Sequence, residues 1–131
     1  MKHIFLLSTW ICFAFLGTNA QTNLIELTPS KEYENINVNK LYDDSLSTSF
    51  VIWIKDSVRP HKHEYHTESL YVVDGTAEMF IGDENITIKP GDFVTIPKNT
   101  VHSAKVTSDK ALKVISVQAP QFIGNDRVFI E

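Results

Sequence analysis

Closely spaced histidines are the part of this sequence most able to do chemistry. Three of them, His61, His63 and His66, fall within six residues, and His102 follows later in the chain. In a β-strand, residues i and i+2 point to the same face, so His61 and His63 direct their rings into one space. Glu68 comes five residues after His63, which leaves room for a turn before the next strand.

Three imidazoles and one carboxylate form a borderline-hard set of nitrogen and oxygen ligands. Such a set suits divalent Mn, Fe, Co, Ni, Cu or Zn and suits Ca or Mg poorly. The alternative is a solvated polar loop, because the segment His-Lys-His-Glu-Tyr-His is hydrophilic throughout. On this segment alone, metal binding and a solvated loop both remain open.

The elements that would position these side chains are short strands. Alternating or β-branched runs bounded by turn residues predict strands over 50–54, 70–73, 77–81, 86–88, 93–96, 101–106 and 112–117. A four-residue loop, Gly82 to Asn85, is expected between the third and fourth of these. No window carries a helical apolar period longer than one turn. The pattern predicts an all-β, antiparallel sandwich or small barrel.

On these strands, period-two alternation places the remaining ligand candidates. Glu68, Leu70 and Val72 are expected on one face of their strand. His102, Ala104 and Val106 are expected on one face of theirs, with Val101, Ser103 and Lys105 on the other.

Two motifs in this region resemble those of the cupin family. The first family motif reads G-x5-H-x-H-x(3,4)-E-x6-G, and here His61-Lys-His63 is followed by four residues, Glu68, six residues and Gly75. The second reads G-x5-P-x-G-x2-H-x3-N, and here Gly91, Pro97, Asn99 and His102 keep its spacing. The resemblance covers about Phe50 to Val117 and is to the small single-domain bacterial type.

The resemblance implies an antiparallel jelly-roll β-barrel with a metal near its mouth. It implies that His61, His63, Glu68 and His102 are the ligands of one divalent first-row transition metal: Mn, Fe, Ni, Zn or Co. This is the set that strand spacing also favours. Three departures occur. Lys55 stands for the opening Gly of the first motif, Val106 for the closing Asn of the second, and Asn99 for the Gly of P-x-G. Asn tolerates a left-handed backbone, so the last turn can still form.

His66 lies outside the motif and has three interpretations. It could replace His63 as a ligand, move a proton during catalysis, or face water, and the last is favoured. Several other side chains are expected to be structural. Gly75 and Gly91 are expected to permit turns with φ > 0, and Asp92 to bond backbone amides. The barrel core is expected to contain Trp53, Tyr71, Phe80, Phe93, Phe50, Met79 and Phe122.

The first twenty residues have the layout of a secretory signal peptide. Met1-Lys2-His3 is a short positive start, an apolar run covers 4–16, and a small residue, Ala20, ends the segment. The run covers about 20 Å as a helix, against about 30 Å for a hydrocarbon core, so no stable membrane anchor is expected. The sequence therefore predicts cleavage after Ala20 and a secreted or periplasmic protein.

The remaining chain is expected to be one domain in three parts: an arm over 21–48 with one short edge strand, the cupin barrel over 49–118, and a tail over 119–131. The tail is expected to pack on the barrel or on a partner subunit, which would give a homodimer. Arg127 in this tail could anchor an anionic substrate, with a surface ion pair as the default. The net charge of −4 and the absence of a basic patch argue against a nucleic-acid partner.

Three functions are compatible with these features. The favoured one is a non-redox metal enzyme acting on a small carbohydrate or sugar acid, of the isomerase, lyase or uronate-converting type. In it, Glu68 or His66 would be catalytic and move the proton. The second is an Fe-dependent dioxygenase, and the third a non-catalytic module that binds metal or sugar. The fold alone does not choose among them, because one cupin site serves many reactions.

Overall fold

The computed structural model describes residues 20–130 of the chain. Residues 1–19 of the predicted signal peptide lie outside this range. Strands account for all the regular secondary structure between residues 20 and 130. In that range no helix has the length and hydropathy needed to cross a membrane.

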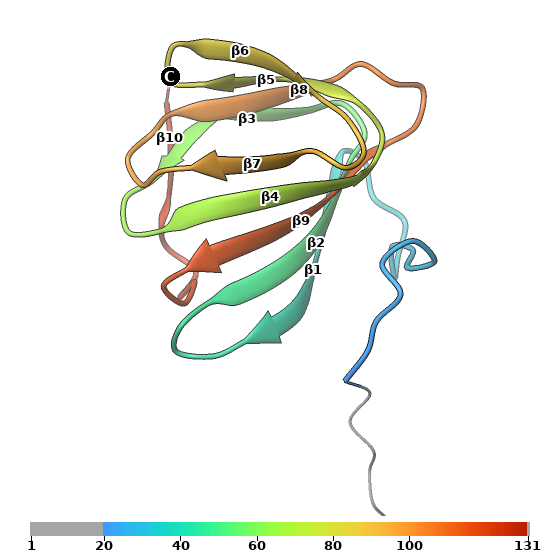
Figure 1. Ribbon diagram of the computed structural model, residues 1–131, viewed down its shortest axis with the longest axis horizontal. Coiled ribbons are helices and arrows are strands. Elements are labelled where there is room, and N and C mark those ends of the chain that lie inside the picture. The colour runs from blue at the N-terminus through green and yellow to red at the C-terminus, as the bar shows by residue number, and fades with distance from the viewer. Residues whose placement is uncertain (1–19, 131) are drawn as a thin grey trace, which may run out of the picture.

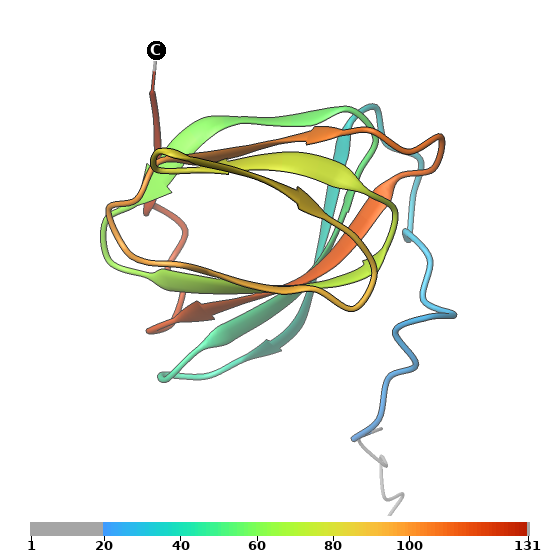
Figure 2. The ribbon, with the colours of Figure 1, turned by 45° about the horizontal axis from the view of Figure 1, so that its top comes forward.

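Two five-stranded antiparallel sheets face each other and form the barrel (Figures 1 and 2). One has the order β1-β2-β9-β4-β7, and the other has the order β10-β3-β8-β5-β6. This confirms the predicted all-β jelly-roll fold. The strands are β1 (Ile36–Asp43), β2 (Thr48–Ile54), β3 (Ser57–His63), β4 (Thr67–Asp74), β5 (Ala77–Ile81), β6 (Glu84–Ile88), β7 (Phe93–Ile96), β8 (His102–Val106), β9 (Leu112–Ala119) and β10 (Arg127–Phe129).

The core lies between the sheets and is built from alternate residues of the strands. Leu70 of β4 pairs with Val94 of the neighbouring β7, and these two residues are buried together with Val72 of β4 and Ile96 of β7. The buried core cluster also contains Ile52, Ile54, Ala77, Met79, Ile88, Ala104, Leu112 and Val114. Burial of these aliphatic side chains drives the two sheets together.

Three of the aromatic residues expected in the core are instead on the outer surface. Trp53 and Met79 are buried as expected, but Tyr71, Phe80 and Phe93 are 45%, 47% and 66% exposed. The reason is strand alternation, because each of the three sits next to an inward residue such as Val72, Met79 or Val94. Tyr71 and Phe93 are direct partners in the register of β4 and β7, so both lie on the outer face of this sheet.

The turns have the conformations predicted from the sequence, with one exception. Gly75, Gly91 and Asn99 have φ angles of 78°, 95° and 63°, so the left-handed conformations expected at all three are confirmed. Asp92 accepts a hydrogen bond from the Lys89 amide, 2.9 Å, also as expected. The β5–β6 loop is shorter than expected. Glu84 already pairs with Ile81, which leaves two residues in the turn rather than four.

The segments before and after the motif region both lie on the barrel. From the arm, β1 pairs with β2 at the edge of its sheet and is eight residues long, longer than the short strand expected. The part of the arm before β1 lies outside the strands, at one side of the barrel (Figure 1). Lys113 holds it there, since its buried ammonium donates to the carbonyls of Leu24 and Leu27. From the tail, β10 pairs with β3.

Candidate metal centre

A bulge in β3 turns the first pair of histidines into the barrel. Val58 pairs with Ala104 and His61 with His102, so β3 advances three residues where β8 advances two. The extra residue reverses the alternation, and as a result His61 and His63 become buried. Pro60 lies in this irregular stretch, where its missing N–H costs no ladder hydrogen bond. The sequence therefore carries its own signal for the bulge, immediately before the first ligand candidate.

The other two ligand candidates come from two further strands. His102 on β8 is the direct cross-strand partner of His61, and their ring centroids lie 4.2 Å apart. The ring centroids of His61 and His102 are 5.2 Å and 5.4 Å from that of His63. Ligand atoms of the three rings all lie within 4.8 Å of one another, and all three side chains are buried.

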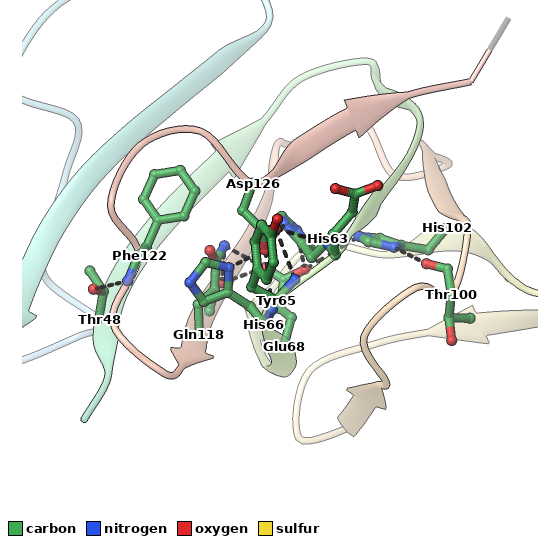
Figure 3. Close-up of polar contacts among 12 residues, drawn as sticks. Thr48, His63, Tyr65, His66, Glu68, Thr100, His102, Gln118, Phe122 and Asp126 are labelled. Atoms are coloured by element: carbon green, nitrogen blue, oxygen red, sulfur yellow. Dashed lines mark hydrogen bonds and ion pairs between the residues drawn. The ribbon is translucent and has the colours of Figure 1, made fainter. Parts of the chain in front are cut away.

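Glu68 approaches these rings from the opposite sheet, on β4. Its Oε2 lies 3.3 Å from His102 Nε2 and 3.5 Å from His63 Nε2. Figure 3 shows the carboxylate among the rings, with Gln118 of β9 beside it. The structure thus brings His61, His63, His102 and Glu68 to one buried place where the two sheets meet.

Two of the rings have their tautomer set by the backbone. His61 Nδ1 lies 2.8 Å from the Arg59 carbonyl, and His102 Nδ1 lies 3.0 Å from the Thr100 carbonyl. A carbonyl only accepts hydrogen bonds, so each Nδ1 carries a proton and Nε2 is the nitrogen left to bind a metal. This is the arrangement of metal-ligating histidines, whose second nitrogen donates to an outer partner.

Glu68 is held as a carboxylate by its neighbours. Burial by itself would raise its pKa, but contacts with the His102 and His63 rings and with the Ser116 hydroxyl outweigh burial, and the pKa lies well below its ordinary value. Ser116 donates to Oε1, and the Gln118 side-chain amide donates to the same oxygen at 3.3 Å. One carboxylate oxygen is therefore fixed by β9, and the other faces the histidines.

The convergence of these atoms fits a cation. His102 Nε2 and both ring nitrogens of His63 are buried and have no hydrogen-bond partner within residues 20–130. The lone pair of His102 Nε2 and a carboxylate oxygen repel one another at 3.3 Å unless a cation or a proton lies between them. Burial, helped by the nearby His102, lowers the pKa of His61 to about 4, so this ring is neutral and able to ligate at neutral pH. Three imidazoles and one carboxylate suit a first-row transition metal.

His66 is buried, so the interpretation that it faces water is wrong. It is 2% exposed, and its Nδ1 hydrogen-bonds to the Asp126 carboxylate of the tail. Its Nε2 lies 2.9 Å from the Gln121 carbonyl. The Asp126 carboxylate also accepts hydrogen bonds from the backbone amides of Glu64, Tyr65 and His66. The burial of His66 depends on a residue 60 positions away, which its own sequence neighbourhood did not indicate.

A cavity of about 60 Å³ adjoins the centre inside the barrel. His61, Glu68 and His102 line it together with core side chains such as Met79, and Arg127 of the tail lines it as well. The surface ion pair expected for Arg127 is wrong for the described residues, because no carboxylate between 20 and 130 lies within 4.0 Å of its guanidinium. The exposed Arg127 thus lines the same cavity as His61, Glu68 and His102.

Comparison with known proteins agrees with this geometry. The family model described as "Cupin domain" matches residues 50–118, which include all four ligand candidates. This chain belongs to the cupin family. Cupins usually hold a transition metal, and in this cupin the buried histidines form groups that could hold one.

Among proteins of known sequence, this cupin is 32% identical to an uncharacterized protein of Aquifex aeolicus over 108 residues, 81% of this chain and 88% of the relative. It is 40% identical over 65 residues to quercetin 2,3-dioxygenase of Bacillus subtilis, covering 50% of this chain and only 19% of that enzyme. Among solved structures, it resembles KdgF from Halomonas sp. with a TM-score of 0.65 and 25% identity. That match covers 71% of this chain and 86% of the other.

Proposed function

We propose that this cupin is a non-redox metal enzyme that acts on a small carbohydrate or sugar acid. The observation that carries the proposal is that His61, Glu68, His102 and Arg127 line one cavity. A metal centre supplies one anchor for substrate oxygens, and a guanidinium binds a carboxylate through paired hydrogen bonds. At about 60 Å³ the cavity has room for the reacting end of such a substrate, and the rest would lie outside it.

His61, His63, His102 and Glu68 would hold the metal in this proposal. When bound, a divalent transition metal acts as a Lewis acid toward oxygen atoms of a substrate. The protein's part is to orient its ligands, through the Arg59 and Thr100 carbonyls and the β9 donors to Glu68. The buried site also excludes bulk water, which strengthens every charge interaction inside it.

Glu68 is the group we propose to move the proton. It is ionised, and its Oε2 is the carboxylate oxygen that faces the histidines, so it can accept a proton from a substrate held against Arg127. His66, the other candidate for this role, has both ring nitrogens against protein oxygens and is not among the residues that line the cavity. Proton movement by His66 would need the tail to shift.

An iron-dependent dioxygenase is the second candidate, and two observations favour it. The cavity is lined largely by aliphatic side chains such as Ile52, Leu70 and Met79, which suit an apolar substrate. The similarity to quercetin 2,3-dioxygenase covers half of this chain at 40% identity. Arg127 favours the first candidate instead.

Metal analysis and two activity assays separate the candidates. The proposal predicts zinc, manganese, nickel or cobalt in the purified protein and an ultraviolet absorbance change on unsaturated uronates or related sugar acids. Iron together with substrate-dependent oxygen uptake would establish the dioxygenase instead. Metal without turnover of either substrate class would indicate a binding module and contradict the proposal.

Arg127→Gln tests the acidic-substrate part of the proposal. It should raise the KM for a sugar acid at least tenfold and leave the KM for the matching neutral sugar unchanged, because only the acid loses a charged partner. Lys89→Gln, which removes an exposed charge from the turn after β6, is the matched control and should change neither value. Equal effects of Arg127→Gln on acid and neutral substrates would contradict an anionic substrate.

We also propose that this cupin is exported after cleavage at Ala20 and that it forms a homodimer. The support for export is the charged and apolar pattern of the first twenty residues. N-terminal sequencing of protein recovered outside the cytoplasm should begin at Gln21. Light scattering of the purified protein should give twice the monomer mass. A cytoplasmic protein that keeps Met1, or a monomer at micromolar concentration, would contradict these two points.

A further inference from the structure

The third histidine of the centre, His63, lacks the backbone partner that the other two have. His61 and His102 each place Nδ1 within 3.0 Å of the carbonyl two residues earlier in the chain. His63 has no hydrogen-bond partner at either ring nitrogen within residues 20–130. A ring without an outer partner can rotate or take either tautomer, which weakens it as a ligand.

The group closest to filling that role comes from the C-terminal tail. Asp126 Oδ2 lies 3.7 Å from His63 Nδ1, on the side of the ring away from Glu68, whose Oε2 lies 3.5 Å from Nε2. Both side chains are buried, at 2% exposure for His63 and 1% for Asp126. A negative charge at this distance and depth favours a proton on Nδ1 and leaves the Nε2 lone pair toward the centre.

Asp126 is itself fixed by the barrel. Its Oδ1 accepts the Glu64 and Tyr65 amides at 2.9 Å each, and its Oδ2 accepts the His66 amide at 3.1 Å and contacts the His66 ring. These contacts hold the carboxylate as an anion and hold the β3–β4 turn in place (Figure 3). That turn joins His63, the last residue of β3, to the strand that carries Glu68.

We propose that Asp126 is a positioning residue of the metal centre, the outer carboxylate that orients His63 and fixes its Nδ1–H tautomer. The proposal rests on the metal-binding function proposed above. It makes the tail part of the site, because the carboxylate that orients a ligand of β3 is supplied from residue 126. The simpler alternative is that Asp126 only anchors the tail and the turn.

Zinc affinities and cobalt spectra of the wild type and three variants distinguish a positioning role from an anchoring role for Asp126. Asp126→Asn keeps the size of the side chain and removes its charge, and it should weaken Zn²⁺ binding about 10- to 100-fold in a chelator competition. It should also change the visible absorption of the Co²⁺-loaded protein, which reports ligand orientation. Asp83→Asn removes an exposed charge from the β5–β6 turn and should leave the affinity and the cobalt spectrum unchanged.

Phe122→Ala is the control for tail anchoring. The Phe122 ring packs 5.8 Å from the Phe50 ring and 5.6 Å from the His66 ring, so its removal loosens the tail without touching the carboxylate. Circular dichroism and thermal unfolding of the metal-free proteins report how much each variant loosens the fold. Asp126→Asn should weaken zinc binding at least fivefold more than Phe122→Ala at a comparable loss of thermal stability.

A measurement on the unsubstituted protein covers the case in which Asp126→Asn does not fold. Nitrogen-15 NMR of the zinc-loaded protein should show His63 protonated at Nδ1 and metallated at Nε2. Metallation at Nδ1, or equal zinc affinity of the Asp126→Asn protein and the wild type, would overturn the role of Asp126. Failure of the wild type to bind zinc or cobalt would instead overturn the metal centre itself, and with it this proposal.

Discussion

Alanine substitutions at two motif glycines should separate backbone strain from steric conflict. Gly75 closes the first cupin motif and Gly91 opens the second, and both have positive φ angles, 78° and 95°. Their surroundings differ. A Cβ on Gly75 would lie 2.7 Å from both the Ala111 carbonyl oxygen and the Leu112 Cα, whereas a Cβ on Gly91 would have nothing within 4 Å. Gly91→Ala is thus a matched control for Gly75→Ala.

The expected loss of folding stability in each variant follows from these contacts. A left-handed backbone costs an alanine about 1–2 kcal/mol, and restriction of the unfolded chain returns about 0.4–1 kcal/mol, so Gly91→Ala should destabilise by about 1 kcal/mol. Gly75→Ala adds a conflict with backbone atoms of the loop into β9, which cannot rotate away as a side chain would. Overpacking of this kind costs about 1–3 kcal/mol, so Gly75→Ala should destabilise the fold by about 3 kcal/mol in all.

Urea unfolding, monitored by Trp fluorescence, measures the stability of both variants. With a slope of about 1.5 kcal/mol per molar, the extra 2 kcal/mol separates the two midpoints by about 1.3 M. Similar midpoints for the two variants would refute the packing argument at Gly75. Wild-type stability for Gly91→Ala would refute the strain argument at positive φ.

Two further predictions concern contacts that hold the site and the arm. Ser116→Ala removes the hydroxyl that fixes Glu68 Oε1 and should weaken Zn²⁺ binding about tenfold, and an unchanged affinity in a chelator competition would contradict the role given to β9. Lys113→Met removes the buried ammonium that holds the arm and should destabilise by about 2 kcal/mol and speed hydrogen exchange of the Leu27 amide. Lys110→Met, which breaks an exposed ion pair with Asp74, is its control and should cost less than about 1 kcal/mol.

Much of the fold was predictable because each strand carries its own pattern. The bounds of β5 and β7 coincide with the predicted 77–81 and 93–96, and the inward faces of Glu68 and His102 follow from alternation alone. The ligand candidates were found for a second reason. His61 and His63 are two residues apart, and their spacing to Glu68 matches a known motif.

The features that were missed depend on contacts between distant residues. Phe93 was expected inside because aromatic residues are usually buried, but pairing of β7 with β4 puts Val94 inward and Phe93 outward. His66 was expected in water because its neighbours are polar, and only the return of the tail to β3 buries it against Asp126. Alternation within β7 makes Phe93 and Val94 point to opposite sides, but which side is inward depends, like the burial of His66, on residues far apart in the chain.

The metal content of the purified protein and of two single variants tests the centre most directly. Elemental analysis should find one transition-metal ion per wild-type chain and less than about one tenth of an ion in His61→Ala and His102→Ala. Both variants should keep the wild-type circular dichroism spectrum, because the aliphatic core cluster is left intact. Full metal occupancy in both folded variants would contradict a centre built from these rings.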